Sequence, residues 1–470
     1  MVVGELAEGI DLLVVGGGPG GYSAALHAAR LGRQVVLVDR AGRDGLGGTC
    51  LWVGCIPSKA LIELAETSHR ARSFTAAGLD AGALEVDLAR FQTWKAGIVS
   101  GLAKGVETLL GQRGVRVLAG TVTFNKPDRA AVATPDGNVT FFEFRDAVVA
   151  AGSLPIGLAA LPRDGKRVLD SSDALALTEV PARLVVVGAG YIGVELGTAF
   201  AKLGSQVTII ESRAGVLPAM DAAVGRLVLR SLRGLGVDVL VRTEALRLED
   251  GGLVVRDEGD ERIVPTDRVV VAVGRRPNTN DLGLQTTGAR LTAGGTVEVD
   301  GARLATRHIA AIGDITAGPA LAHKATAEAE VAVEVLSGRR AVFNPRAVPE
   351  VVFSDPEVAV VGLTEEQARS AEMDVTVAQF PLSASGRAAT MGSQAGFARL
   401  VIDRVQDAVV GVVLVGPYVS ELAGEAALAV EMGASPEDLA GTIHPHPSIS
   451  ESLREAAGMA VGRPLHTAIS

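Results

Sequence analysis

The fold is decided by a glycine-rich stretch near the start of the chain, Leu12-Leu13-Val14-Val15-Gly16-Gly17-Gly18-Pro19-Gly20-Gly21. Four apolar residues, typical of a buried parallel strand, run into glycines spaced G-x-G-x-x-G, and a helical segment follows over residues 22–31. A second apolar strand, residues 35–38, ends at Asp39. In such a βαβ unit Gly16 makes the tight turn, Gly18 lets the backbone approach a pyrophosphate, and Gly21 lets helix and strand pack closely. The stretch therefore predicts a dinucleotide site.

The same pattern occurs again in the middle of the chain. Residues 184–187 form the apolar strand, and the turn carries Gly188, Gly190 and Gly193. A second strand over residues 207–210 ends at Glu211, so glycines and acid keep the same mutual offsets as in the first copy. One G-x-G-x-x-G is a weak signal, whereas two complete units are a strong one. We therefore expect two bound dinucleotides.

The acid that closes each unit is expected to accept hydrogen bonds from ribose hydroxyls. Asp39 would do so in the first site and Glu211 in the second. A carboxylate at Glu211 pairs with a free 2′-hydroxyl and repels a 2′-phosphate, so the second site should prefer NAD(H) to NADP(H). Arg213 is close in sequence and weakens this preference slightly.

Composition restricts the classes of protein. The formal charge is 44 − 54 = −10, which argues against a nucleic-acid-binding protein. Only two cysteines occur in 470 residues, which fits a reducing cytoplasm better than a disulfide-built secreted protein. Residues 1–10 carry no basic leader region, and no apolar run reaches the roughly 18–20 residues of a membrane helix. We expect a cytoplasmic protein of about three domains, with no membrane or nucleic-acid partner and no metal site.

The two cysteines lie close together, in Gly47-Gly48-Thr49-Cys50-Leu51-Trp52-Val53-Gly54-Cys55-Ile56-Pro57-Ser58-Lys59. A disulfide closing so small a loop removes little chain entropy, and a chain of this length does not need one. Redox chemistry and two inert buried thiols are the two interpretations of the pair. On regular helix geometry Cys50 and Cys55 would be about 8–9 Å apart, too far for a disulfide, so a bend is expected, which Gly54 permits.

Together these features resemble the pyridine-nucleotide disulfide oxidoreductases, and within that family the dihydrolipoamide dehydrogenases, the E3 flavoproteins of 2-oxoacid dehydrogenase complexes. The resemblance runs over nearly the whole chain. Besides the cysteine segment, it rests on Gly188-Ala189-Gly190-Tyr191-Ile192-Gly193-Val194-Glu195, Val273-Gly274-Arg275-Arg276-Pro277-Asn278, Ile312-Gly313-Asp314, Ser354-Asp355-Pro356-Glu357-Val358-Ala359 and His444-Pro445-His446-Pro447-Ser448-Ile449-Ser450-Glu451.

The resemblance implies an α/β fold with two Rossmann-like dinucleotide-binding domains, for FAD and NAD, and a C-terminal α+β dimerisation domain. The first part of the FAD domain would cover residues 1–152 and the NAD domain residues 153–276. Residues 277–346 would complete the FAD or central domain, and residues 347–470 would form the interface domain.

The resemblance also implies an electron route from a dithiol to a protein disulfide, to flavin and to NAD. Cys50 would be the outer, interchange thiol, and Cys55 would lie against the flavin as a thiolate. His446 would be the base that deprotonates the substrate, since the pKa of histidine lies nearest the working pH. Glu451 would orient His446, because a carboxylate partner fixes the tautomer of the imidazole and stabilises its protonated form. Lys59 and Glu195 match the family's ion pair beside the reactive edge of the flavin, and His444 matches no catalytic position.

Further residues border the two cofactors in this family. Asp314, after an apolar strand at residues 308–312, would bind the ribityl chain of FAD. Gly152, in the segment that closes the FAD-binding half, and Gly274 would lie in cofactor-binding turns. Tyr191 is either a gate over the nicotinamide pocket or an aromatic residue that packs on the turn.

The expected partners follow from the same resemblance. In this family the histidine comes from the other subunit, so a homodimer would share its active sites. The lipoyl domain and the subunit-binding domain of a 2-oxoacid dehydrogenase acyltransferase would be the protein partners. The alternative function is that of another NAD(P)H-dependent disulfide reductase, similar to glutathione reductase, although Glu211 opposes NADPH. A protein that acts mainly as a docked structural component is a third interpretation.

Overall fold

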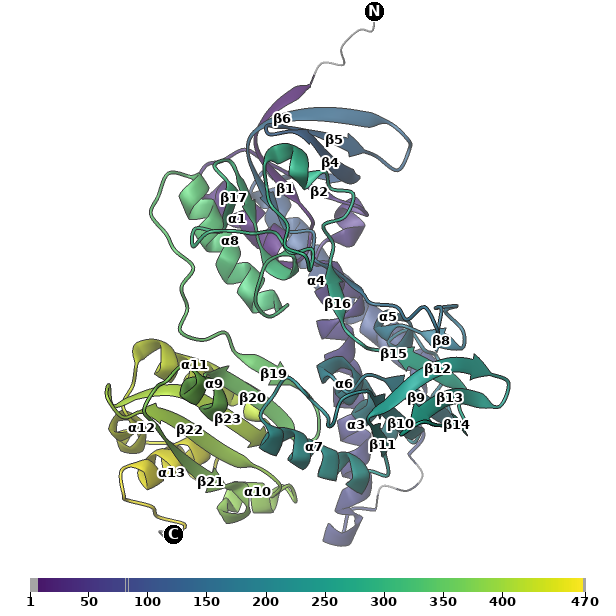
Figure 1. Ribbon diagram of the computed structural model, residues 1–470, viewed down its shortest axis with the longest axis vertical. Helices are drawn as coiled ribbons and strands as arrows, with labels where there is room; N and C mark the ends of the chain where they lie inside the picture. The colour runs from purple at the N-terminus through teal and green to yellow at the C-terminus, as the bar shows by residue number, and fades with distance from the viewer. Residues whose placement is uncertain (1–6, 81, 83, 468–470) are drawn as a thin grey trace, which may run out of the picture.

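The computed structural model describes residues 7–80, 82 and 84–467. Its strands form three sheets of five or more strands and two smaller ones, arranged as Figure 1 shows. The prediction that the chain has no secretory signal concerns residues 1–10, of which residues 1–6 lie outside the described part. Within the described part, no helix combines the length and apolarity that crossing a bilayer requires.

The first sheet has the strand order β17-β18-β6-β1-β2-β3, and β4 and β5 extend it through β6. β1 pairs in parallel with both β2 and β6, and β18 pairs in parallel with β6. The helices and strands of this unit are β1 (Glu8–Val15), α1 (Pro19–Arg30), β2 (Val35–Asp39), α2 (Gly48–Val53), α3 (Cys55–Ser73), α4 (Leu88–Gln112), β3 (Arg116–Ala119), β4 (Thr121–Lys126), β5 (Arg129–Ala133), β6 (Val139–Val149), β17 (Leu304–Thr306), β18 (Ile309–Ala311) and α8 (Ala322–Leu336).

Both faces of this sheet are covered, which explains the unbroken apolar run of β1. Leu12 and Val14 pack in a cluster with α1 and α8, whereas Leu13 and Val15 pack against the antiparallel β4–β5–β6 strands on the other face. Successive side chains of a strand point to opposite faces, so a strand buried on both sides has no polar alternation.

The second sheet repeats this plan with the order β11-β10-β9-β15-β8. In β9, Leu184 and Val186 pack with the helices, and Val185 and Val187 pack toward a three-stranded antiparallel sheet. The elements of this unit are β8 (Val168–Leu169), α5 (Ser171–Ala174), β9 (Arg183–Val187), α6 (Tyr191–Lys202), β10 (Gln206–Glu211), α7 (Ala222–Gly234), β11 (Asp238–Val241), β12 (Thr243–Glu249), β13 (Gly252–Asp257), β14 (Asp260–Val264) and β15 (Arg268–Val271).

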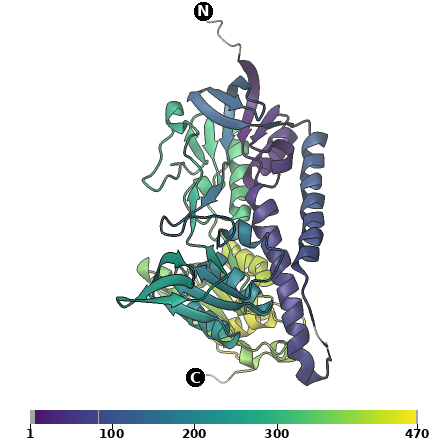
Figure 2. The same cartoon turned by 90° about the vertical axis from the view of Figure 1, so that its right-hand side faces the viewer.

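Two short strands connect the first two units. The chain leaves the first sheet through β7 (Ser153–Pro155) and returns through β16 (Arg275–Pro277), and the two pair antiparallel. In Figure 1 β16 lies in the passage between the upper and the lower right part of the molecule. The long helix α3 joins the same two parts from another side, because it packs against α6; Figure 2 shows it running down the side of the molecule.

The C-terminal unit is an antiparallel sheet in the order β19-β20-β23-β22-β21, with helices on one face. Its other face, which includes Val358 and Val413, joins the cluster of α3, α6 and α7. Its elements are β19 (Glu350–Val352), β20 (Glu357–Gly362), α9 (Glu365–Ser370), β21 (Val375–Pro381), α10 (Gly386–Thr390), β22 (Phe397–Asp403), β23 (Ala408–Gly416), α11 (Ala423–Met432), α12 (Pro436–Gly441) and α13 (Glu451–Ala460). The expected fold class, two Rossmann-like units and an α+β unit, is confirmed.

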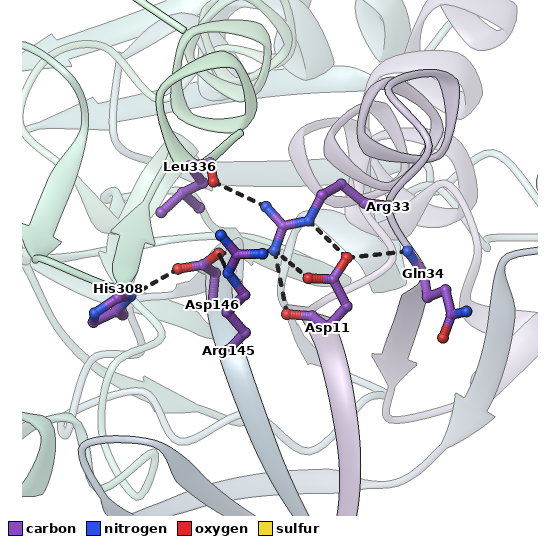
Figure 3. A network of polar contacts seen from close by, with 7 residues as sticks. All are labelled: Asp11, Arg33, Gln34, Arg145, Asp146, His308 and Leu336. Carbon is purple, nitrogen blue, oxygen red and sulfur yellow. Dashed lines mark hydrogen bonds and ion pairs between the residues drawn. The ribbon is translucent and has the colours of Figure 1, made fainter. Parts of the chain in front are cut away.

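A buried arginine fastens the first unit at the edge away from its glycine turn. Arg33 binds the carboxylates of Asp11 and Asp146 at 2.7 Å each and donates to Leu336 O at 2.9 Å (Figure 3). His308 contacts the other oxygen of Asp146 at 2.9 Å. One guanidinium thus joins the start of β1, the strand β6 and the end of α8. A buried ion of this kind requires several partners to offset its desolvation, and the fork of arginine supplies them.

Candidate active site

A cavity of about 560 Å³ lies where the first two units meet. One end is lined by the β1–α1 turn and the end of β2, and its middle by α2 and the start of α3. The far end is lined by Tyr191, Ile192 and Glu195 of α6 and by Arg275 of β16. The cavity therefore connects the first glycine turn with the second unit, past both cysteines.

The first glycine turn is shaped for a phosphate ligand. Gly16 has a φ of +101°, and a Cβ on Gly21 would lie 1.8 Å from Gly16 O. Gly18 precedes α1 as its N-cap and provides no side-chain cap, and Gly17 N donates to Asp39 Oδ2 at 2.8 Å. The helix N-terminus therefore presents unpaired N–H groups and a positive dipole end at the cavity, which fits the pyrophosphate of FAD, and Asp39 lies beside it for a ribose.

The second glycine turn has the same geometry. Gly188 has a φ of +107°, a Cβ on Gly193 would lie 1.9 Å from Gly188 O, and Ala189 N donates to Glu211 Oε2 at 2.8 Å. Gly190 precedes α6 as its N-cap and provides no side-chain cap, and a Cβ added there would meet no atom within 4 Å. The open space and the uncapped helix end fit the pyrophosphate of NAD.

The cysteines lie on either side of a break in the helix, as their spacing predicts. Cys50 belongs to α2, Cys55 is the first residue of α3, and Gly54 between them has φ −136° and ψ −111°. A Cβ on Gly54 would lie 2.8 Å from Thr49 O, so the bend requires a glycine. Both cysteines are free thiols that line the cavity, Cys50 half-buried and Cys55 exposed, so they are not a buried pair.

The two thiols differ in acidity. The hydrogen bond from Cys50 and the charge of Lys59 outweigh burial and lower the pKa of Cys55 to about 7. The same hydrogen bond, with burial, raises the pKa of Cys50. Above about pH 7 the reduced pair therefore holds one negative charge, on the sulfur at the start of α3, where the helix dipole also favours it.

Lys59 and Glu195 form the expected ion pair, with Nζ 2.9 Å from Oε2. Phe353 N donates to Glu195 Oε1 at 3.0 Å, and Lys59 Nζ lies 4.5 Å from the centre of the Phe353 ring. The pair joins α3 of the first unit to α6 of the second, and a residue of the C-terminal unit holds it in place. Both members line the cavity.

Tyr191, the first residue of α6, stands on the cavity wall with 43 % of its surface exposed. Burial of the hydroxyl raises its pKa to about 12, so the phenol is neutral at physiological pH. The position is compatible with a gate, and the alternative of packing on the turn stays open.

Asp314 and the two predicted cofactor glycines surround the passage between the units. Gly152 has a φ of +71° and Gly274 a φ of +133°. Asp314 lines the cavity and accepts a hydrogen bond from Ser153 Oγ at 2.5 Å. The contacts of Ser153 with Asp314 and Arg275 were not predicted, although Arg275 stands in one of the motifs quoted above. A serine and an arginine far apart in sequence give no sign that they meet.

His446 and Glu451 are brought together in the C-terminal unit, with Nδ1 2.9 Å from Oε1. Burial opposes ionisation of Glu451, but hydrogen bonds from Ser448 N and His446 outweigh it and lower its pKa. The His446 side chain is 76 % exposed. His444, expected to be structural, contacts Glu425 Oε1 at 2.7 Å. Of the described residues, none beyond Ala325 lines the cavity, so His446 lies outside it.

Comparison with protein families accounts for this arrangement. Residues 10–329 match the family described as pyridine nucleotide-disulphide oxidoreductase, and residues 348–457 match the dimerisation domain of that family. The chain belongs to this family. The match covers both glycine turns, the cysteine pair, and the histidine and glutamate of the C-terminal unit.

Relatives that match nearly the full length of the chain show which enzymes of this family it is similar to. The chain is 42 % identical to dihydrolipoyl dehydrogenase of Geobacillus stearothermophilus, over 99 % of each chain. It is 44 % identical to dihydrolipoyl dehydrogenase of Pseudomonas aeruginosa, over 97 % of this chain and 98 % of that one. It is also similar to the crystal structure of LpdA from Mycobacterium tuberculosis, with a TM-score of 0.87, 30 % identity, and coverage of 95 % and 99 %.

A second solved structure shows that the fold also serves other disulfide reductases. The HOCl-induced flavoprotein disulfide reductase RclA from Escherichia coli matches with a TM-score of 0.83 at 26 % identity, over 95 % of this chain and 99 % of that chain. This chain is thus an oxidoreductase of the dihydrolipoyl dehydrogenase type that uses FAD and NAD. Within the described residues, no group of three or more His, Cys, Asp or Glu could hold a metal ion.

Proposed function

We propose that this enzyme oxidises protein-bound dihydrolipoamide to lipoamide and reduces NAD⁺ to NADH, as the E3 component of a 2-oxoacid dehydrogenase complex. The observation that supports it most is the placement of Cys50 and Cys55 on one wall of the cavity, between the first glycine turn and the Lys59–Glu195 pair. When bound, FAD accepts the two electrons of the dithiol and passes them to NAD⁺ as a hydride.

Cys50 and Cys55 carry out the exchange of disulfide bonds with the substrate. In the oxidised enzyme a substrate thiolate attacks Cys50 Sγ, a mixed disulfide forms, the Cys50–Cys55 bond breaks, and Cys55 leaves as a thiolate. The lowered pKa of Cys55 makes it the better leaving group. The second substrate thiolate then attacks the substrate sulfur of the mixed disulfide, which releases the cyclic disulfide and expels Cys50 as a thiolate. This thiolate takes up one of the protons that the base removed from the substrate. The sum is dithiol plus NAD⁺ giving disulfide, NADH and a proton.

His446 is the proposed base for the substrate thiols, and Glu451 its positioning residue. The carboxylate accepts from Nδ1, so Nε2 is free to take a proton, and its charge stabilises the imidazolium that results. Lys59 and Glu195 border the reactive end of the cavity. There the lysine stabilises negative charge on Cys55 and would do the same for the isoalloxazine ring of FAD, while the glutamate fixes the lysine in position.

We further propose a homodimer in which His446 of one subunit serves the cysteines of the other. Two facts support this: the C-terminal region matches a dimerisation domain, and His446 is exposed and lies outside the cavity of its own chain.

The domain boundaries that we propose are those expected from the sequence: residues 1–152, 153–276, 277–346 and 347–470. The lipoyl and subunit-binding domains of an acyltransferase are the proposed protein partners, and the cytoplasm the proposed location.

The initial rate of nicotinamide reduction by dihydrolipoamide, measured with NAD⁺ and NADP⁺ side by side, tests the activity. We expect a fast rate with NAD⁺ alone. The alternative is a glutathione-reductase-like enzyme. Tyr191 at the cavity wall supports it, because the glutathione reductases resemble this chain in having a tyrosine there, over the nicotinamide pocket. A rate with glutathione disulfide and NADPH, and none with dihydrolipoamide, would establish that alternative instead.

Subunit mixing tests the shared site. Cys50→Ser and His446→Gln should each keep the FAD and lose dithiol turnover. After exchange of subunits, the mixed dimer has one site with both native groups, so part of the activity should return. No return after proven exchange would place the whole site within one chain.

A binding experiment tests the docking role. Retention of the enzyme by an immobilised subunit-binding domain of an acyltransferase would support this role, and no retention by any such domain would contradict it.

A further inference from the structure

The two strands that connect the nucleotide-binding units make a weak joint by themselves. β7 and β16 are three residues long, and each ends in proline. Pro155 lies opposite Arg275 and Pro277 opposite Ser153, and neither proline has an N–H to donate. Backbone bonds flank the pair, from Ile156 N to Gly274 O at 3.0 Å and from Asn278 N to Gly152 O at 2.9 Å. A ribbon of two strands is marginal without other contacts.

Arg275 supplies the contacts that the prolines cannot. Its Nη2 donates to Ser153 O at 2.8 Å and its Nε donates to Ser153 Oγ at 2.8 Å. Ser153 Oγ in turn donates to Asp314 Oδ2 at 2.5 Å. Ser153 is 7 % exposed, so the hydroxyl at the centre of this chain of bonds is shielded from water. One guanidinium therefore joins the returning strand to the outgoing strand and, through a hydroxyl, to the carboxylate predicted to bind the ribityl chain.

This chain of bonds has a counterpart in the Lys59–Glu195 pair, which joins α3 to α6. Both tie the second unit to the first, and Lys59, Glu195, Arg275 and Asp314 all line the cavity. Tyr191, at the same end, faces the positive charge of Arg275. The second unit is thus held by a polar contact through α3 and α6 and by another at the connecting strands.

We propose that Arg275, with Ser153 and Asp314, is a positioning device that fixes the NAD unit relative to the FAD unit, so that the nicotinamide meets the flavin at the distance hydride transfer requires. The inference rests on the proposed function only for its electron route. Misplacing reacting groups by an ångström costs on the order of a hundredfold in rate. Arg275 acts through the orientation of the two units and not on the dithiol, so the two half-reactions should respond differently.

The experiment measures the half-reactions separately on the FAD-loaded enzyme, by anaerobic stopped-flow absorbance of the flavin. We expect Arg275→Gln to slow reduction of the flavin by NADH by about tenfold or more. Reduction of the flavin by dihydrolipoamide and the FAD dissociation constant should stay at the native values. Arg275→Lys keeps a donor for Ser153 Oγ but loses the second, bidentate bond, so it should restore part of the rate. Arg276→Gln, at the exposed neighbouring position, is the control.

Ser153→Ala makes the test independent of how well Arg275→Gln folds. It should slow the NADH step less than Arg275→Gln does, because Arg275 Nη2 keeps its bond to Ser153 O. The double variant should be no slower than Arg275→Gln, because that substitution already removes both bonds to Ser153. Unchanged NADH reduction in both variants would overturn the proposal. Equal slowing of both half-reactions together with loss of FAD would overturn it too, since the three residues would then only retain the cofactor. A native enzyme that NADH reduces and dihydrolipoamide does not would defeat the proposed function alone.

Discussion

The two nucleotide-binding units use one local design in two different surroundings. In each, the closing carboxylate accepts the N–H that follows the first glycine, at 2.8 Å in both. Gly16 and Asp39, however, line the cavity that continues to the cysteines, whereas Gly188 and Glu211 do not. We expect this difference to keep the first cofactor as a resident part of the enzyme and to let the second exchange during turnover. The same turn can serve both because it binds only the pyrophosphate and ribose, and the two surroundings differ.

The third glycines should show the largest difference between the units. A methyl group at Gly21 or Gly193 would lie within 2 Å of a carbonyl oxygen of its own turn. Only a shift of the backbone would relieve this overpacking. We expect Gly21→Ala to abolish FAD binding and to lower the free energy of unfolding by about 3 kcal/mol. Gly193→Ala should keep FAD and lose NADH binding. The measurements are the flavin-to-protein absorbance ratio, thermal unfolding, and titration with NADH.

Gly97→Ala is the control, because Gly97 lies in α4 with no atom within 4 Å of an added Cβ. Alanine there should stabilise the protein by about 0.5–1 kcal/mol. If Gly193→Ala lost FAD as readily as Gly21→Ala, the two units would not be independent, and the comparison would fail.

The closing carboxylate of the second unit should set the choice of nicotinamide cofactor. Glu211 accepts from Ala189 N and Arg213 N, so Glu211→Gln keeps an acceptor while it removes the charge. We expect the ratio of kcat/KM for NAD⁺ over NADP⁺ to fall by about tenfold, or ~1.4 kcal/mol. Glu244→Gln makes the same charge change at an exposed position of β12, and should leave the ratio unaltered. An unaltered ratio in Glu211→Gln as well would remove this carboxylate from cofactor selection.

The smallest effect concerns the thiolate at the junction of the two units. Because the pKa of Cys55 is lowered to about 7, the thiolate of the reduced enzyme should persist above that pH and be protonated below it. The charge of Lys59 contributes to this lowering, so Lys59→Met should move the midpoint upward by about one pH unit. Thiolate absorbance of the anaerobic, dithiol-reduced enzyme reports it, with Lys104→Met, an exposed lysine of α4, as control. A midpoint near 9 in the native enzyme would contradict the assignment.

Much of the site could be predicted because its residues lie close together in the sequence. Both glycine turns, the cysteine pair with its bend at Gly54, and the His446–Glu451 contact are local features with fixed spacing. The Lys59–Glu195 pair is not local, and only the resemblance to a family connected its members. Nothing in the spacing of Ser153, Arg275 and Asp314 indicates that they meet.

The sequence by itself determined the βαβ units, because apolar runs, glycine offsets and a closing acid are requirements of the backbone within about 30 residues. It also indicated that the two cysteines form a pair, since two thiols separated by four residues can meet once a glycine bends the helix. Only the tertiary structure decided that the first turn opens on the cavity and that Ser153 joins Arg275 to Asp314. The resemblance alone implied a thiolate at Cys55 and a histidine that serves the other subunit, and the structure adds the contacts that lower the pKa of Cys55 and the position of His446 outside the cavity of its own chain. These properties depend on the distances between units, which packing sets and no local pattern records.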